Sequence, residues 1–198
     1  MMALNIAFFA DLLVQSVKRP REAAQRVIAL DLPVPLLGQA AVAVAAASAV
    51  LSWFATVFFP VPVETPWMAL TASPLRMALV QLAGMLLVAG VMTGLGRVFG
   101  GKGRYAQALA LAVWIDAALL CVQAAQVVLM LLFPLFASAL GLVAFVLFLR
   151  MTTLFTAALH DFQSGFLVFL GVTATFLMAV LVVAILLGML GLVPAAGA

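Results

Sequence analysis

Five long apolar stretches, separated by short polar or proline-containing segments, dominate the hydrophobic pattern of the chain. Because about 20 apolar residues suffice to cross the hydrocarbon core of a bilayer, each stretch predicts one membrane-spanning helix. Pro134 is the one strong helix breaker between Ala106 and Leu159, so the third and fourth helices are divided there. The pattern predicts an all-α polytopic membrane protein with a transmembrane domain over residues 36–191, whose five helices cover about 36–59, 77–99, 106–133, 135–157 and 166–191.

The first 35 residues form a different kind of segment, with apolar and polar residues at helical spacing. We expect residues 1–35 to form a cytoplasmic amphipathic segment lying at the membrane interface, with its apolar side made by Ile6, Phe9, Leu13 and Val17. A second short helix is expected from Arg21 to Leu30, with Pro20 in its first turn. The alternative is a solvated segment that only sets the topology. Asp11 interrupts the first apolar run and no basic residue precedes that run, so we expect no cleaved signal peptide.

The basic residues lie mostly on one side of this five-helix arrangement. One side receives Lys18, Arg19, Arg21, Arg26, Arg97, Lys102, Arg104 and Arg150, whereas the other receives only Arg76. Short cytoplasmic loops are enriched in Lys and Arg, so the N-terminus is expected in the cytoplasm and the tail 192–198 outside it. The cluster of Lys18, Arg19, Arg21 and Arg26 would also favour anionic lipid headgroups at the interface.

Composition narrows the classes of function. Hydrophobic residues make up 68% of the chain and charged residues 8%, and the net charge of +3 does not indicate a nucleic-acid partner. The chain has one cysteine, Cys121, and one histidine, His160, so no disulfide framework, metal site or bound cofactor is expected. His160 and Asp161 are interpreted as capping and hydrated residues in a cytoplasmic turn. Without a set of catalytic residues, the sequence predicts a protein that is not an enzyme.

Asp116 is the exception among these apolar helices, because it lies about ten residues into the third one. A charge near the middle of a membrane costs about 2.5 to 3.5 kcal/mol and usually faces the interior of a helix bundle with a partner. We expect a buried ion pair with Arg150 on the antiparallel fourth helix, with Gln123 and Gln126 nearby. A neutral buried aspartate and a substrate or proton site are the alternatives.

Two further features of the sequence, a helix-packing face and a tight turn, involve glycines. Gly90 and Gly94 have the spacing that lets membrane helices approach closely, and we expect this face to pack on another helix of the chain or, alternatively, to form a dimer. Ala41, Ala45 and Ala49 repeat this spacing on the first membrane helix. The glycines from Gly96 to Gly103 resemble a phosphate-binding loop, but Gly103 follows Lys102 where Ser or Thr is needed. They are expected to end the second membrane helix and turn the chain into the third.

The order of three short motifs resembles the Yip-one domain family, the Ypt/Rab-interacting membrane proteins, in its short bacterial branch. These are Arg19-Pro20-Arg21-Glu22, the turn from Gly100 to Tyr105, and His160-Asp161-Phe162 before the last helix. The resemblance implies five membrane helices and covers nearly the whole chain. Eukaryotic relatives are implicated in vesicle traffic and recruit small GTPases through a longer cytosolic region, which this chain replaces with about 35 residues. The family tends to have a proline in the third helix, where this chain has Asp116.

Seven arginines against two lysines, with abundant Ala, Val, Leu and Gly, indicate a GC-rich bacterial genome and a location in the cell inner membrane. The expected function is that of a membrane scaffold, assembly factor or accessory subunit that binds lipids, other membrane proteins or a larger membrane complex. The alternative is a small transporter or channel for a lipid or small solute that uses the Asp116, Gln123 and Gln126 face. Equal internal repeats are typical of transporters, and five helices do not divide into two halves.

Overall fold

A computed structural model describes residues 6–59 and 73–189 of the chain. In this part all regular structure is helical, which confirms the predicted fold class. Five of the helices are long and apolar enough to cross a membrane. The helices are α1 (Ile6–Lys18), α2 (Pro20–Ala29), α3 (Val34–Phe58), α5 (Pro74–Val98), α6 (Tyr105–Leu132), α7 (Pro134–Leu159) and α8 (Gly165–Met189). The expected tail 192–198 and the first five residues lie outside the described part.

Local sequence signals explain most of the helix ends. Pro134 begins α7 directly after Phe133, which ends α6. The Ser73 hydroxyl accepts the Arg76 N–H at the start of α5, and the Ser164 hydroxyl accepts the Leu167 N–H at the start of α8. These residues satisfy N–H groups that a helix leaves without partners in its first turn.

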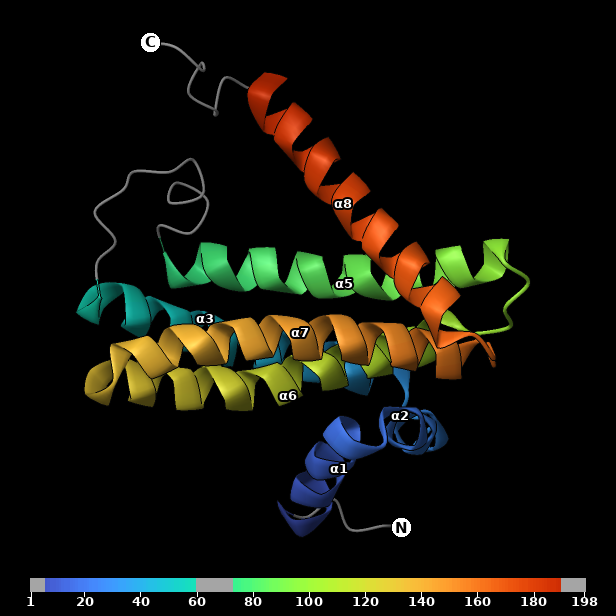
Figure 1. Ribbon diagram of the computed structural model, residues 1–198, viewed down its shortest axis with the longest axis horizontal. Coiled ribbons are helices and arrows are strands. Elements are labelled where there is room, and N and C mark those ends of the chain that lie inside the picture. Colours follow the sequence, from blue (N-terminus) through green and yellow to red (C-terminus); the bar gives the residue numbers. More distant parts are fainter. Residues whose placement is uncertain (1–5, 60–72, 190–198) are drawn as a thin grey trace.

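Helices α3, α5, α6 and α7 form a bundle, in which α6 packs on α3, α5 and α7, and α3 also packs on α5 (Figure 1). The small residues Ala41, Ala45 and Ala49 of α3 are buried, as expected for a stripe that lets helices approach closely. Larger side chains such as Met85, Leu111 and Phe155 fill the remaining core. The bundle therefore combines close backbone approach on α3 with bulky side chains on its neighbours.

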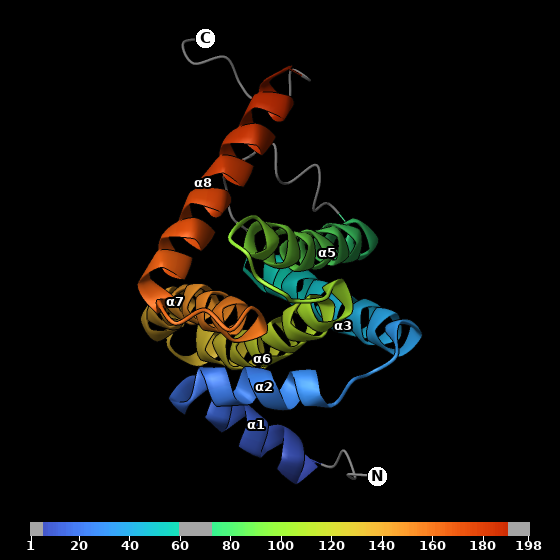
Figure 2. The same ribbon diagram turned by 90° about the vertical axis from the view of Figure 1, so that its right-hand side faces the viewer.

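Helices α1 and α2 form a hairpin that packs against α6 and α7, and α8 leaves the end of α7 on a different side of the bundle (Figure 2). Helix α8 packs mainly on α7 through its first turns and then runs obliquely away from the other long helices (Figure 1). The turns from α5 to α6 and from α7 to α8 lie at the same end of the bundle, next to α2 (Figure 1). We call this end, which carries Arg97, Lys102 and Arg104, the basic end.

Helix α1 turns one side toward the helix bundle. Leu12 and Ser16 are completely buried, whereas Ile6 is 88% exposed and Val17 is 46% exposed. The side made by Ile6, Phe9, Leu13 and Val17 was expected to face the membrane interface, and that expectation stays a prediction. Helix α1 has apolar residues on both sides, and Trp114 of α6 selects the Leu12 and Ser16 side by donating its indole N–H to the Ser16 hydroxyl at 2.8 Å.

Candidate functional site

Asp116 and Arg150, the expected ion pair, bind different groups. The Asp116 carboxylate accepts a hydrogen bond from the Gln81 side-chain amide of α5, with Nε2 and Oδ1 3.2 Å apart. The Arg150 guanidinium donates to the main-chain carbonyl of Val17 in the last turn of α1. The predicted pair is therefore wrong, and the two side chains join different pairs of helices. Arg150 meets a carbonyl at a helix C-terminus, where the helix dipole favours a positive charge.

The two glutamines also join helices. Gln123 donates from Nε2 to the Ser52 hydroxyl at 2.7 Å and to the Ser48 carbonyl oxygen at 3.3 Å, both on α3. Gln126 of α6 packs against α7 at Gly141, where a Cβ atom would lie 3.0 Å from its Nε2. Asp116 and Gln123, seven residues apart on α6, thus hold α5 and α3 respectively. Such hydrogen bonds between membrane helices are worth about 0.6 kcal/mol on average.

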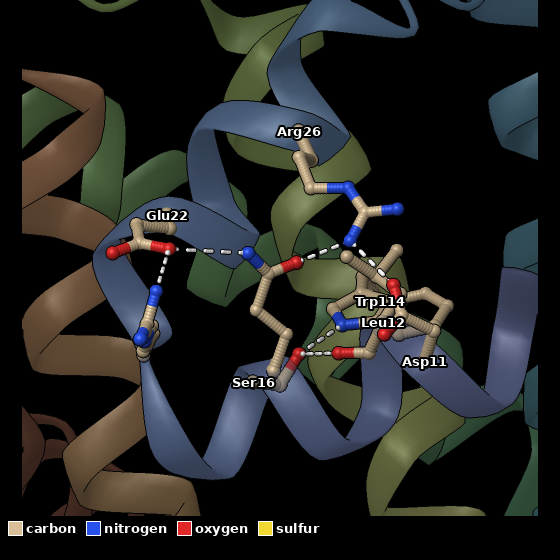
Figure 3. Close-up of polar contacts among 8 residues, drawn as sticks. Asp11, Leu12, Ser16, Glu22, Arg26 and Trp114 are labelled. Atoms are coloured by element: carbon tan, nitrogen blue, oxygen red, sulfur yellow. Dashed lines mark hydrogen bonds and ion pairs between the residues drawn. The ribbon is translucent and has the colours of Figure 1, made fainter.

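A group of polar side chains fastens the α1–α2 hairpin (Figure 3). The Arg26 guanidinium pairs with the Asp11 carboxylate at 2.7 Å, donates to the Gln15 side-chain oxygen, and lies over the Phe8 ring. The Gln15 amide in turn donates to Glu22, which also pairs with Arg19 at 3.5 Å. These contacts join α1 to α2 across the turn between them.

The basic residues expected at the lipid headgroups therefore have different surroundings. Arg26 is committed to the hairpin, and Arg19 lies exposed beside Glu22. Lys18 is exposed at the end of α1. Arg21 is only partly exposed and donates from Nη2 to the Gln163 carbonyl oxygen at 3.1 Å, which places its charge beside the turn between α7 and α8. Of these four basic residues, Lys18 and Arg21 have the positions that best suit binding of an anion from outside the protein.

His160 is the residue that the sequence analysis placed wrongly. Instead of lying hydrated in a turn, it is 5% exposed and joins three segments at the basic end. Its Nδ1 atom accepts the Gly103 N–H at 3.1 Å, and its Nε2 atom lies 2.8 Å from the Met92 carbonyl oxygen. Because a carbonyl oxygen can only accept, the hydrogen-bond network assigns the proton to Nε2, which makes the ring the neutral Nε2–H tautomer.

Three glycines make room for the His160 ring. A Cβ atom added at Gly96, Gly101 or Gly103 would lie 1.9, 2.2 or 2.6 Å from the nearest atom of His160 or its neighbour Leu159. Gly100, with a φ of +83°, ends α5 in a Schellman turn in which the Gly101 N–H donates to the Gly96 carbonyl oxygen at 2.8 Å. The expected role of these glycines in ending the helix is therefore confirmed.

Gly90 and Gly94 do not have the packing role expected of them within the chain. Both are exposed, and no described atom beyond their own helix segment lies within 4 Å of a Cβ added at either position. The close contact of α5 is made two residues farther along, at Gly96, on another side of the helix. The four-residue spacing of Gly90 and Gly94 identified α5 as a glycine-rich helix, but it did not identify the face of α5 that packs against the rest of the protein.

The family model of the Yip1 domain matches residues 14–191. The chain belongs to the Yip1 domain family. No curated protein and no solved structure matches the chain.

The matched range places several of these contacts inside the Yip1 domain. It begins within α1 and includes all of α2, so much of the hairpin belongs to the domain. It also includes the His160 contacts, which sequence reasoning missed. A usable signal was the concentration of glycines from Gly96 to Gly103, since closely spaced glycines allow a bulky group to approach the backbone. Among the described residues of this Yip1 domain, no three His, Cys, Asp or Glu side chains are grouped as a metal site.

Proposed function

We propose that this protein is a non-enzymatic membrane scaffold or accessory subunit that binds lipids or partner proteins on the sides of its helix bundle. One observation carries the proposal: the side chains of Asp116 and Gln123, which the transporter alternative would place along a solute path, are hydrogen-bonded to other helices of the bundle. Gln81 binds Asp116, and Gln123 binds Ser48 and Ser52. A solute pathway would need such groups free to replace the hydration of the solute.

The cavities of the structure support a role for its lateral surfaces. One, of about 590 Å³, lies between α5, α8 and the turn before α8. A second, of about 430 Å³, lies between the α1–α2 hairpin and helices α3 and α6. Both are lined mainly by apolar side chains, and α8 presents exposed apolar residues such as Leu177 and Leu181. Apolar surfaces of membrane helices meet lipid tails or other membrane helices.

We propose that the protein lies in the inner membrane of a bacterium, with the basic end in the cytoplasm. In this arrangement residues 1–35 lie at the inner interface, residues 36–191 cross the membrane five times, and residues 192–198 lie outside the cytoplasm. Its support is the distribution of charge, because Arg97, Lys102 and Arg104 share one end of the bundle and Arg76 lies at the start of α5, toward the other.

A photo-crosslinking amino acid tests the scaffold proposal in intact cells. Placed at Leu181, on the exposed surface of α8, it should give discrete adducts with one or a few membrane proteins. Placed at Ala41, which is 1% exposed between helices, it should give none. The scaffold proposal would be overturned in favour of a transporter if Leu181 gave no protein adduct and proteoliposomes showed a solute flux that Asp116→Leu abolishes.

A further inference from the structure

The residues that line the larger cavity indicate the class of ligand that it would bind. Its walls come from the last turn of α5, the turn between α7 and α8, and one side of α8, where Leu167, Gly171 and Ala174 follow helical spacing. Apolar residues predominate, whereas Gln163 and Ser164 contribute polar groups at the turn. The volume of about 590 Å³ lies within the roughly 300 to 1,000 Å³ typical of small-ligand pockets. We call this cavity the α5–α8 cleft.

The α5–α8 cleft follows from the way α8 leaves the bundle. Helix α8 approaches α5 closely at Gly171, where an added Cβ atom would lie 3.4 Å from the Leu95 side chain. On the other side, Val168 and Val172 pack with Ala157 of α7. Helix α8 thus packs on α7 along one side and approaches α5 at Gly171 and Leu95, which both line the α5–α8 cleft. Because these helices are membrane spans by length and composition, the apolar part of the cleft faces lipid chains rather than water.

A positive charge lies at the polar end of the α5–α8 cleft. The Arg21 guanidinium donates to the carbonyl oxygen of Gln163, a cleft residue, and its Nη2 atom lies 3.7 Å from the position of a Cβ on Gly165. The ion pairs among the described residues use Arg19, Arg26 and Arg104, so no described carboxylate lies within 4 Å of the Arg21 guanidinium nitrogens. A guanidinium has five N–H donors in a fork that fits phosphate oxygens, and the Gln163 carbonyl occupies only part of this capacity.

We propose that the α5–α8 cleft binds one phospholipid with a net negative headgroup, whose acyl chain fills the apolar cleft and whose phosphate is bound by Arg21. The proposal rests on the lipid-binding part of the proposed function and names its site and ligand class. An apolar cleft that ends at a cationic side chain matches the two parts of such a lipid. Basic pockets between membrane helices are a known means of binding anionic lipid headgroups.

Lipid retention during native mass spectrometry tests the proposal on the full chain. The protein is exchanged into detergent and offered phosphatidylglycerol, which is anionic, or phosphatidylcholine, which is zwitterionic, with the same acyl chains. We expect one phosphatidylglycerol to be retained at least tenfold more strongly than phosphatidylcholine, because the quaternary ammonium of choline cancels the charge of its phosphate and is repelled by the Arg21 guanidinium. Equal retention of the two lipids would overturn the assignment of the headgroup.

Two pairs of variants locate the lipid. Ala174→Phe fills the α5–α8 cleft, whereas Met178→Phe adds an aromatic ring at a 60% exposed position of the same helix. Arg21→Gln removes the proposed phosphate ligand, whereas Arg19→Gln removes the same charge from an exposed neighbour. We expect Ala174→Phe and Arg21→Gln each to lower phosphatidylglycerol retention about tenfold or more, with little change in the other two.

Arg21→Lys is the conservative control for Arg21→Gln, because lysine keeps the positive charge and can donate to the phosphate and to the Gln163 carbonyl. It should retain most of the lipid. Unchanged retention in Ala174→Phe, with thermal unfolding showing a folded protein, would overturn the site, and so would unchanged retention in Arg21→Gln. A dimer in the wild type that Ala174→Phe dissociates would assign the cleft to a second copy instead. Protein adducts from Leu181 that persist when lipid specificity fails would leave the scaffold proposal standing without the lipid site.

Discussion

Replacing Gly96 with alanine should test the central contact of the basic end with a single methyl group. The added Cβ atom would lie 1.9 Å from His160 Nε2, and its three nearest atoms all belong to the imidazole ring. Such a separation is far below van der Waals contact, so the ring has to move by more than an ångström. Moving it breaks the hydrogen bonds to the Met92 carbonyl and the Gly103 N–H, which are both buried.

The expected size of the effect comes from these two hydrogen bonds. A buried donor or acceptor left without its partner costs about 1 to 3 kcal/mol, so Gly96→Ala should lower the free energy of unfolding by about 2 to 6 kcal/mol. Gly90→Ala is the matched control, since it adds the same methyl group to the same helix where no described atom beyond the local helix lies within 4 Å. It should leave the free energy of unfolding unchanged or raise it by up to about 1 kcal/mol, because alanine favours the helix more than glycine does. Unfolding in mixed detergent micelles measures both.

A double variant identifies His160 as the cause. In a His160→Ala background the ring is gone, and the methyl group of Gly96→Ala has space. The second substitution should then cost little, so the two losses should be far from additive. Equal stability of Gly96→Ala and Gly90→Ala, or additive losses in the double variant, would refute the proposed packing of the ring against Gly96.

Other contacts give smaller, separate expectations. Thermal unfolding of Asp116→Leu, Arg150→Leu and the double variant should show additive losses, because the two side chains bind different helices; rescue in the double variant would instead reveal coupling. Gln123→Leu should lower the free energy of unfolding by about 0.6 kcal/mol and by no more than about 1.7 kcal/mol in the same micelle assay. Alkaline phosphatase fused after Ala198 should be active in a bacterial host and inactive when fused after Gly101, and the reverse pattern would invert the proposed orientation.

The sequence was sufficient for the features that depend on local chemistry. Pro134 divides a long apolar block because proline cannot continue a helix, and it is the first residue of α7. The glycines after Gly96 end α5 because Gly100 adopts a positive φ that other residues rarely adopt. Five apolar stretches gave five membrane helices because length and hydropathy alone decide which helices can span a bilayer.

The sequence alone did not show which side of each helix faces which neighbour, because this depends on how the helices are rotated about their axes. Asp116 and Arg150 lie on the antiparallel neighbours α6 and α7, but Arg150 binds α1, a helix that was expected at the membrane interface and not as a partner of Arg150. Gly90, Gly94 and Gly96 share one helix, and only the position of His160 makes Gly96 the packed one. His160 itself binds residues 57 and 68 positions away, so its burial became visible only with the tertiary structure.

The hairpin at the start of the chain has a consequence for the order in which the molecule is completed. Among the described residues, polar links join the hairpin to later parts of the chain between Ser16 and Trp114, Val17 and Arg150, and Arg21 and Gln163, which lie 98, 133 and 142 positions apart. Synthesis produces the hairpin before α6 and α7, yet its binding surface is complete only after α7 and the following turn exist. Until then the buried side of the hairpin, including Leu12 and Val27, lacks its partners in α6 and α7. Contacts between such distant residues close long loops, which costs conformational entropy. The hairpin therefore docks at a late stage of assembly, when the membrane helices are already in place.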